Sequence, residues 1–294
     1  MESCKRTLVD EQMKKVLVTG SSGYIGQHLC LYLAKMGYHV TGLDRLECGT
    51  GCHEFIHQSI LDTADIKSEF DAVVHLAALV QVGMSRYCMM EYYRNNVVGT
   101  MNMLERLNYD TFIFASTCQA NEPHTYGKTK LIGEHLVKDY CESRDTPHTI
   151  FRFGNVVGTA GYEPTNTDGL LYNLIKAKKT GTFYLYGNDY HTKDGTANRD
   201  YIHVMEVVYA IEKAICRPSR VIDADTYPYI EYLGHGQLYS VLECVEAFKK
   251  ANKCNFDVVV KPRRIGDPAN VEIKYPISPY MVEEKCPLEE MMRV

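Results

Sequence analysis

The sequence of 294 residues has no tryptophan and no long uninterrupted apolar run. Its most apolar stretch, residues 73–82, is broken by His75 and Gln81, and it falls well short of the roughly 18 apolar residues that a membrane-spanning helix needs. Residues 1–14 are rich in charge and lack the apolar core of a secretion signal. These absences predict a cytoplasmic protein that does not cross a membrane.

An excess of positive charge is also lacking. The formal net charge is -5, so nothing in the composition favours a nucleic acid as partner. Hydrophobic residues make up 45% of the chain and charged residues 23%, a balance that is too apolar for disorder. A chain of this length can bury a large core and form two lobes, so we expect a globular enzyme.

Cysteine is abundant, with 11 residues, but the cysteines are scattered and no secretion signal accompanies them, which favours reduced thiols. One cluster, Cys48, Cys52, His53 and His57, has a spacing near that of known zinc sites. These residues fall in a short loop after the second predicted strand, where several would have to fold back on themselves. We therefore expect no metal site.

The apolar pattern alternates between strands and helices. Residues 15–19 and 38–43 have the pattern of buried strands, and an amphipathic helix over 25–36, ended by Gly37, joins them. Further strands are predicted at 72–76, 111–115 and 149–153, and further helices at 93–107 and 126–139. This order predicts an α/β fold with a Rossmann-type, doubly wound parallel sheet and helices on both faces.

The composition changes after Phe153, because residues 158–169 are rich in Gly, Thr, Asn and Asp. We predict a first domain over residues 1–154 and a smaller C-terminal α/β lobe over residues 155–294. Residues 199–216 regain a strand-then-helix pattern, so we expect them to return to the main sheet.

Three glycines follow the first predicted strand with the spacing Gly-x-x-Gly-x-x-Gly, instead of the Gly-x-Gly-x-x-Gly of most dehydrogenases. Gly20 permits the tight turn, Gly23 lets the backbone approach a pyrophosphate, and Gly26 allows the helix and the strand to pack closely. The N-terminus of the helix then faces the anion. The turn predicts a dinucleotide site.

Asp44 closes the second strand, where its carboxylate can accept both hydroxyls of the adenosine ribose. Its charge repels a 2′-phosphate, so NAD is the expected cofactor in preference to NADP. The adjacent Arg45 would soften that repulsion, but an exposed loop arginine is the simpler interpretation.

Tyr126 and Lys130 are four residues apart, on one face of a predicted helix. Tyr126 can act as a general base if its pKa falls from about 10 to about 7, which requires roughly 4 kcal/mol of preferential phenolate stabilisation. The Lys130 ammonium and an oxidised nicotinamide can together supply it, and Thr117 can hydrogen-bond the reacting oxygen. The same spacing is common on ordinary helices, so the pair alone does not establish a function.

Several motifs together resemble the extended short-chain dehydrogenase/reductases, and later motifs resemble the UDP-glucose 4-epimerase family. The first group comprises residues 20–26, 75–78 (His-Leu-Ala-Ala), 96–100 (Asn-Val-Val-Gly-Thr), 114–117 (Phe-Ala-Ser-Thr) and 126–130 (Tyr-Gly-Lys-Thr-Lys). The second group comprises residues 186–190 (Tyr-Gly-Asn-Asp-Tyr), 194–196 (Asp-Gly-Thr), 199–204 (Arg-Asp-Tyr-Ile-His-Val) and 263–267 (Arg-Arg-Ile-Gly-Asp). The similarity extends from about Lys15 to Met291.

The resemblance implies roles for individual residues. Thr117, Tyr126 and Lys130 take the catalytic positions, with threonine where the family often has serine. The positions that hold NAD match Gly20, Gly23, Tyr24, Ile25, Gly26, Asp44, Ile60, Leu76, Ala77, Asn96, Tyr126, Lys130 and Gly154. The positions that hold the UDP-hexose match Thr117, Asn155, Tyr184, Tyr186, Arg199, Arg264 and Asp267. On this basis residues 1–154 bind NAD, residues 155–294 bind the nucleotide sugar, and the protein is a homodimer.

The implied activity is that of an isomerase, a UDP-glucose/UDP-galactose 4-epimerase. Tyr126 removes the proton from the sugar 4-hydroxyl while hydride leaves C4 for tightly held NAD, and the 4-keto sugar then turns about its diphosphate linkage. Return of the hydride to the opposite face inverts C4 without net oxidation. Val271 stands where the family has a residue beside the C2 substituent, and its small side chain predicts that UDP-GlcNAc and UDP-GalNAc are also accepted.

Some positions depart from the family pattern. Eight residues separate Thr117 from Tyr126, whereas the family inserts a longer loop that helps to roof the substrate. Ser59 replaces an acidic residue that meets the adenine, and Val80 replaces a lysine near the cofactor ribose, so weaker NAD binding is expected. His75 and His203 are expected to be packed, hydrogen-bonded histidines.

Three alternatives remain open. Nucleotide-sugar 4,6-dehydratases place an Asp-Glu pair after the catalytic threonine, but Cys118 and Gln119 follow Thr117 here. A 4-reductase that uses NADPH is opposed by Asp44. A non-catalytic NAD-binding sensor or scaffold is favoured by the short loop and opposed by the intact catalytic residues.

Overall fold

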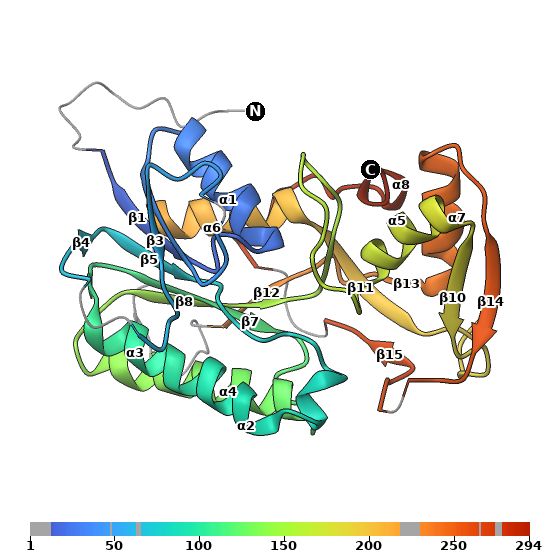
Figure 1. Cartoon of the computed structure of the whole chain (residues 1–294), viewed down its shortest axis with the longest axis horizontal. Helices are drawn as coiled ribbons and strands as arrows, with labels where there is room; N and C mark the ends of the chain where they lie inside the picture. The colour runs from blue at the N-terminus through green and yellow to red at the C-terminus, as the bar shows by residue number, and fades with distance from the viewer. Residues whose placement is uncertain (1–12, 48, 63–65, 218–229, 265, 274–277) are drawn as a thin grey trace.

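A parallel sheet of seven strands forms the centre of the structure (Figure 1). The computed structural model describes residues 13–47, 49–62, 66–217, 230–264, 266–273 and 278–294. In spatial order the strands are β12 (Ile230–Leu233), β8 (His148–Phe153), β7 (Phe112–Thr117), β5 (Ala72–His75), β1 (Lys15–Thr19), β2 (His39–Asp44) and β3 (Glu54–His57). Every neighbouring pair is parallel, which confirms the Rossmann-type sheet predicted from the sequence.

Helices cover both faces of this sheet. One face carries α1 (Tyr24–Lys35) and α6 (Val204–Cys216), and the other carries α2 (Met89–Tyr93), α3 (Gly99–Arg106) and α4 (Thr125–Glu142) (Figure 1). Val16 and Val18 of β1 join the apolar core beneath α1 and α6, while Leu17 joins the core beneath α3 and α4. Because alternate side chains of a strand point to opposite faces, a strand covered on both sides is a continuous apolar run.

The stretch predicted as a helix over residues 93–107 is helical in the structure, but it is not regular. α2, a π-helical turn at Arg94–Val98 and α3 follow one another without a break from Met89 to Arg106. A π turn inserts an extra residue into a helix, and this one includes Asn96. The buried Asn96 amide hydrogen-bonds the Leu79 backbone, at 2.8 Å from its nitrogen and 3.0 Å from its oxygen. The helical stretch is therefore confirmed, whereas the π turn was not predicted, because apolar periodicity does not register a turn held by a distant backbone.

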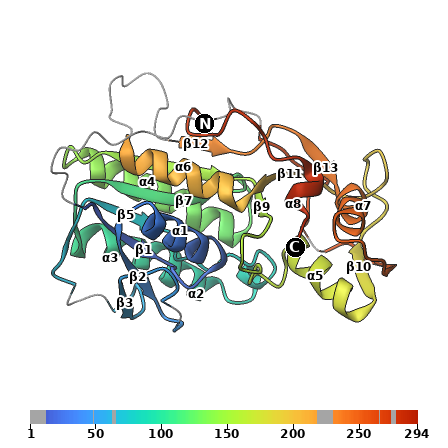
Figure 2. The same ribbon diagram turned by 90° about the horizontal axis from the view of Figure 1, so that it is seen from above.

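A smaller group of elements stands at one end of the molecule (Figure 2). Its strands are β9 (Asn155–Val157), β10 (Thr182–Tyr186), β11 (Asn198–His203), β13 (Leu238–Ser240), β14 (Asp257–Lys261) and β15 (Asn270–Val271), and its helices are α5 (Leu170–Thr180), α7 (Val241–Ala251) and α8 (Leu288–Met291). β11 pairs with β9, β13 and β15, and β10 pairs with β14. Leu174, Phe183 and Phe248 belong to a separate apolar core among these elements.

The chain passes between the two groups more than once. α6 packs against α1 beside the main sheet, whereas β11, directly before α6, belongs to the four-stranded sheet. β12 comes from the later part of the chain and pairs with β8 at the edge of the main sheet. A domain boundary at residue 154 stays a prediction. A short ladder of β4 (Glu69–Phe70) and β6 (Asn108–Tyr109) and a 3-10 turn, η1 (Met84–Arg86), complete the elements.

The cysteine and histidine cluster lies around the turn between β2 and β3. Cys52 and His53 belong to this turn and His57 ends β3, while Cys48 lies outside the described residues. The Nδ1 atom of His53 accepts a hydrogen bond from the Val40 N–H at 3.1 Å. Across the part of the chain that the structure describes, no three His, Cys, Asp or Glu side chains are grouped to hold a metal ion. Within the same residues, no helix combines the length and apolarity required to cross a membrane.

The turn from β1 into α1 depends on two of its glycines. Gly20 has a φ of +73°, which L side chains rarely adopt, and a Cβ atom there would lie 2.8 Å from the Ala77 nitrogen. A Cβ atom on Gly26 would lie 2.1 Å from the Gly20 carbonyl oxygen. Gly26 therefore lets the start of α1 lie close to the turn that directly follows β1, whereas close packing of the helix on the strand itself was predicted from the sequence.

The substitution Gly26→Ala tests this close approach. Because the added methyl group must displace backbone, we expect the free energy of unfolding, measured by urea denaturation, to fall by about 2 kcal/mol or more. Gly83→Ala is the matched control, since its Cβ atom would meet only Asp168 Oδ2, at 3.8 Å. It should change the stability by less than about 0.5 kcal/mol. Equal losses in the two variants would contradict the close packing.

Candidate active site

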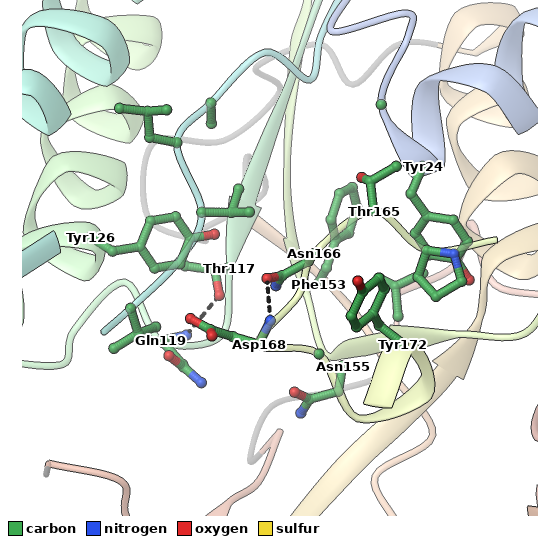
Figure 3. Close-up of a pocket in the computed structure, with 18 of the residues that line it drawn as sticks. Tyr24, Thr117, Gln119, Tyr126, Phe153, Asn155, Thr165, Asn166, Asp168 and Tyr172 are labelled. Carbon is green, nitrogen blue, oxygen red and sulfur yellow. Dashed lines mark hydrogen bonds between the residues drawn. The ribbon is translucent and has the colours of Figure 1, made fainter. Parts of the chain in front are cut away.

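One cavity of about 850 Å³ lies at the carboxyl ends of the main-sheet strands, where open α/β sheets bind their ligands. It brings together all the predicted site residues except Asn96. They are Gly20, Gly23, Tyr24, Ile25, Gly26, Asp44, Ile60, Leu76, Ala77, Thr117, Tyr126, Lys130, Gly154, Asn155, Tyr184, Tyr186, Arg199, Arg264 and Asp267. Figure 3 shows Tyr24 and Tyr126 on opposite sides of this cavity.

The N-terminus of α1 lines the cavity through Tyr24, Ile25 and Gly26. Gly23 is the N-cap and provides no side-chain hydrogen bond, and no acidic residue stands in the first turn. The N–H groups of a first helical turn have no partner within the helix and carry partial positive charge. They fit a diphosphate, and the glycine turn lets it approach.

Asp44 ends β2 beside the glycine turn. Its Oδ2 atom accepts from the Ser22 N–H at 3.0 Å, and its Oδ1 atom accepts from the Leu46 N–H at 2.9 Å. These bonds orient the carboxylate and leave each oxygen a lone pair for another donor. Arg45 lines the cavity next to it. The arrangement fits the adenosine half of a dinucleotide, with the ribose hydroxyls donating to Asp44.

Asn96 is buried behind the cavity instead of lining it. Besides its bonds to the Leu79 backbone, its amide donates to Thr129 Oγ1 at 3.1 Å, which ties the segment after β5 to α4. Leu79 itself lines the cavity, so Asn96 shapes the cofactor side from behind. Ser59 and Val80 line the cavity as uncharged side chains, and the weaker NAD binding expected from them stays a prediction.

Thr117, Tyr126 and Lys130 come from two adjoining elements. Thr117 is the last residue of β7, while Tyr126 and Lys130 lie one turn apart in α4. Because β7 continues beyond the predicted strand end at residue 115, the strand and not a loop holds Thr117. Lys130 is only 3% exposed, and its Nζ atom lies 4.4 Å from the centre of the Phe114 ring.

Burial controls the protonation of these residues. It raises the pKa of Tyr126, and a hydrogen bond with Thr117 acts in the opposite direction. It lowers the pKa of Lys130 to about 7, and the Glu134 carboxylate acts in the opposite direction. These side chains alone keep Tyr126 protonated near neutral pH. A phenolate at this position needs a second positive charge in addition to the Lys130 ammonium.

His75 and His203 are packed, hydrogen-bonded histidines, as expected. His75 is buried with its ring nitrogens 2.7 Å from Thr19 Oγ1 and 3.0 Å from Thr100 Oγ1. Burial and the nearby charge of Lys130 lower the pKa of His75 to about 3, so its ring is neutral at physiological pH. His203 caps α6, because its Nδ1 atom accepts from a first-turn backbone N–H at 3.1 Å.

Two arginines and two tyrosines line another part of the cavity. Nη2 of Arg199 lies 2.5 Å from Asp267 Oδ1, and its Nη1 donates to the carbonyl oxygens of Asn198 and Ala269 at 2.8 and 3.4 Å. These bonds fix the guanidinium and leave Nε–H and the second Nη2–H for an anion. The guanidinium carbon of Arg264 lies 4.4 Å from the centre of the Tyr186 ring. Tyr184 and Tyr186 are 49% and 39% exposed on β10. Guanidinium groups can bind a diphosphate and aromatic rings can stack on a base, so this part of the cavity fits a nucleoside diphosphate.

Most of the segment 164–173 also lines the cavity, although none of its residues was among the predicted site residues. Figure 3 shows Asn166 and Asp168 of this segment among the residues that face the cavity. Nε2 of Gln81 donates to Thr167 Oγ1 at 2.9 Å, so the segment reaches across to the loop after β5. It therefore forms part of the cavity wall. The run of polar residues at 165–168 after a strand was the available signal.

Val271 is buried on β15, opposite Arg199 on β11. Residues that oppose one another in a parallel pair point to the same face of the sheet, so Val271 lies on the Arg199 side. It is not among the residues that line the cavity. The link between its small size and the accepted sugars stays a prediction.

Known proteins share the sequence and the fold of this chain. The model of the NAD dependent epimerase/dehydratase family matches residues 16–227. A UDP-glucose 4-epimerase of Erwinia amylovora is 35% identical over 300 residues, covering 86% of this chain and 87% of that protein. The structure of UDP-glucose 4-epimerase from Brucella ovis in complex with NAD has a TM-score of 0.82 at 26% identity, covering 95% of this chain and 96% of that one. UDP-glucose 4-epimerase from Bifidobacterium longum, in complex with NAD+ and UDP, has a TM-score of 0.79 at 26% identity and the same two coverages, 95% and 96%. The chain therefore belongs to the NAD-dependent epimerase/dehydratase family.

Proposed function

We propose that the protein is an NAD-dependent 4-epimerase, an isomerase that interconverts UDP-glucose and UDP-galactose. A single observation carries the proposal. The glycine turn and Asp44, the arginines Arg199 and Arg264, and Tyr126 all line the same cavity. A dinucleotide and a nucleotide sugar that fill this cavity would meet at the catalytic residues.

NAD, when bound, supplies a hydride acceptor and the second positive charge that a phenolate needs. Tyr126 then acts as the general base for the sugar 4-hydroxyl, and the Thr117 hydroxyl holds the reacting oxygen. Lys130 adds its charge one turn away, because its pKa of about 7 leaves a large fraction protonated at neutral pH.

Inversion requires that both faces of C4 can be presented to the hydride carrier, while the 4-oxygen stays within reach of Tyr126. We propose that Arg199 and Arg264 anchor the diphosphate through charge-assisted hydrogen bonds, while Tyr184 and Tyr186 hold the uracil ring. The hexose keeps only weaker contacts, such as the one with Thr117, and can turn about the diphosphate linkage. Binding energy is then concentrated on the part of the substrate that does not react.

The residues of this cavity are less suited to the two alternative reactions, the elimination of a 4,6-dehydratase and the reduction of a 4-reductase. A 4,6-dehydratase needs an acid that protonates the leaving group at C6. The residues after Thr117 are Cys118 and Gln119, and burial raises the pKa of Cys118 to about 11, which makes the thiol too weak an acid near neutral pH. Asp44 opposes the 2′-phosphate of NADPH and with it the reductase.

The substitution Tyr126→Phe tests the proposed function. Purified protein given UDP-galactose without added cofactor should form UDP-glucose, resolved by NMR, and the variant should be slower by about 10²- to 10⁴-fold because the base is gone. Tyr140→Phe is the matched control, since Tyr140 lies in the same helix and its hydroxyl has no hydrogen-bond partner among the described residues.

The other possible products of this assay distinguish the epimerase from a dehydratase and from a non-catalytic sensor. Undiminished turnover by Tyr126→Phe would overturn the mechanism. A 4-keto-6-deoxy sugar would identify a dehydratase, and copurified NAD without any product would identify a non-catalytic sensor.

We also propose that UDP-GlcNAc and UDP-GalNAc are accepted, because position 271 carries a small valine. Val271→Tyr should lower kcat/KM for the acetylated sugars by about tenfold or more, with a smaller effect on UDP-galactose. Steady-state kinetics with both pairs of sugars measure this. The idea fails if the unaltered protein turns over UDP-galactose well and the acetylated sugars not at all.

We further propose that the protein acts in the cytoplasm as a homodimer. α3 and α4 pack side by side, and Met101 of α3 and Ile132 of α4 expose apolar side chains, which a second copy could cover. Sedimentation should give twice the 33.5 kDa of one chain. Ile132→Lys should shift the protein toward monomer, whereas Met36→Lys, at an exposed apolar position after α1, should not. A monomeric unaltered protein at micromolar concentration would contradict this.

A further inference from the structure

A buried ion pair lies directly behind the catalytic residues. Glu134 of α4 and Arg152 of β8 are 3% and 5% exposed. Nε of Arg152 donates to Glu134 Oε1 at 2.8 Å, and its Nη2 donates to Oε2 at 2.5 Å, in the forked geometry that favours strong pairing. The Ser116 hydroxyl also bonds Oε1, and Nη1 of Arg152 donates to the Tyr232 hydroxyl at 2.9 Å. One carboxylate therefore joins α4 to β7 and β8.

Stability alone does not explain this pair. Removing two charges from water costs about as much as their attraction returns, and apolar residues of similar volume are often at least as stable in the same place. Val137 of α4 and Ile150 of β8 are apolar, buried neighbours in this layer. A carboxylate at Glu134 therefore points to a use for its charge and its orientation.

The position of Glu134 connects it to all three catalytic residues. Tyr126, Lys130 and Glu134 are spaced four residues apart in α4, so they share one face of the helix. Ser116, which bonds Glu134, directly precedes Thr117 in β7. A shift of the carboxylate would move the helix against the strand, and with it Tyr126 against Thr117.

Charge links Glu134 to Lys130 as well. The Glu134 carboxylate raises the pKa of Lys130 against the stronger effect of burial. Among the described residues, the Phe114 ring on β7 lies against the ammonium, and His75 on β5 is neutral with a pKa that the Lys130 charge helps to lower. Tyr126 stands one turn earlier on α4 and is protonated. The nearest positive charge on β8, that of Arg152, is paired with Glu134 itself.

We propose that Glu134 is a positioning residue of this site, which holds α4 against β7 and β8 and keeps the Lys130 ammonium charged. Ser116 and Arg152 fix its carboxylate. The catalytic part of the inference rests on the proposed function, whereas the charge of Lys130 can be measured without it.

The substitution Glu134→Gln keeps the size of the side chain and removes the charge. Without the carboxylate the pKa of Lys130 falls further, so the ammonium loses its proton at a lower pH. The pH at which kcat falls on the alkaline side should decrease by about one unit. At any pH above the Lys130 pKa of both proteins, kcat of the variant should be about tenfold lower. Ser116→Ala is the matched control, because it removes one hydrogen bond and leaves the charge, and its alkaline limb should stay in place.

A second measurement does not depend on activity. The ¹³Cε signal of labelled lysine, assigned with the Lys130→Arg variant, reports proton binding at Lys130 directly. It should titrate about one pH unit lower in Glu134→Gln than in the unaltered protein or in Ser116→Ala. Since Glu134→Gln leaves a buried Arg152 unpaired and is destabilising, the double variant Glu134→Gln with Arg152→Gln is titrated beside it.

The outcomes separate the inference from the proposed function. A lowered titration of Lys130 in both variants supports the role of Glu134. An unchanged titration would overturn it even if activity fell, because Glu134 would then be a purely structural residue. Absence of epimerase activity in the unaltered protein would refute the proposed function and leave the titration result standing.

Discussion

The burial of the Lys130 ammonium is the constraint around which the catalytic residues are arranged. A lysine removed from water loses its proton readily, and here the pKa is lowered to about 7. The Phe114 ring and the Glu134 carboxylate favour the charged form, while the neutral His75 adds no competing charge. The apolar surroundings that weaken the charge also strengthen its effect on neighbouring groups, because a low dielectric screens little.

The parallel sheet brings residues that are distant in the sequence to the cavity that this ammonium lines. The glycine turn follows β1, Asp44 ends β2, Thr117 ends β7 and Gly154 follows β8. Strand direction is the common cause, since all carboxyl ends of a parallel sheet lie along one edge. Rigid strands hold these positions, and the more adaptable segments between elements complete the walls of the cavity.

The sequence predicts most of the sheet and most of the cavity for a physical reason. Doubly covered strands are continuous apolar runs, and the turn glycines and Asp44 stand at strand ends, where local patterns are strong. What it does not predict depends on contacts between distant segments. The π turn at Asn96 is held by the Leu79 backbone, and Glu134 becomes significant only when β8 places Arg152 beside it. Asn166 and Asp168 reach the cavity through the path of a whole segment, which periodicity does not describe.

The edge strand β12 has a consequence for the way this protein is made. β8 has no outer neighbour until β12, far along the chain, pairs with it, and the apolar face that α1 shares with α6 is likewise covered late. A nascent chain that has emerged only to residue 154 therefore exposes an open strand edge and an uncovered core, both of which promote aggregation. The first 154 residues thus do not complete the sheet by themselves: the chain must be made at least as far as β12, at Ile230–Leu233, before the sheet can close.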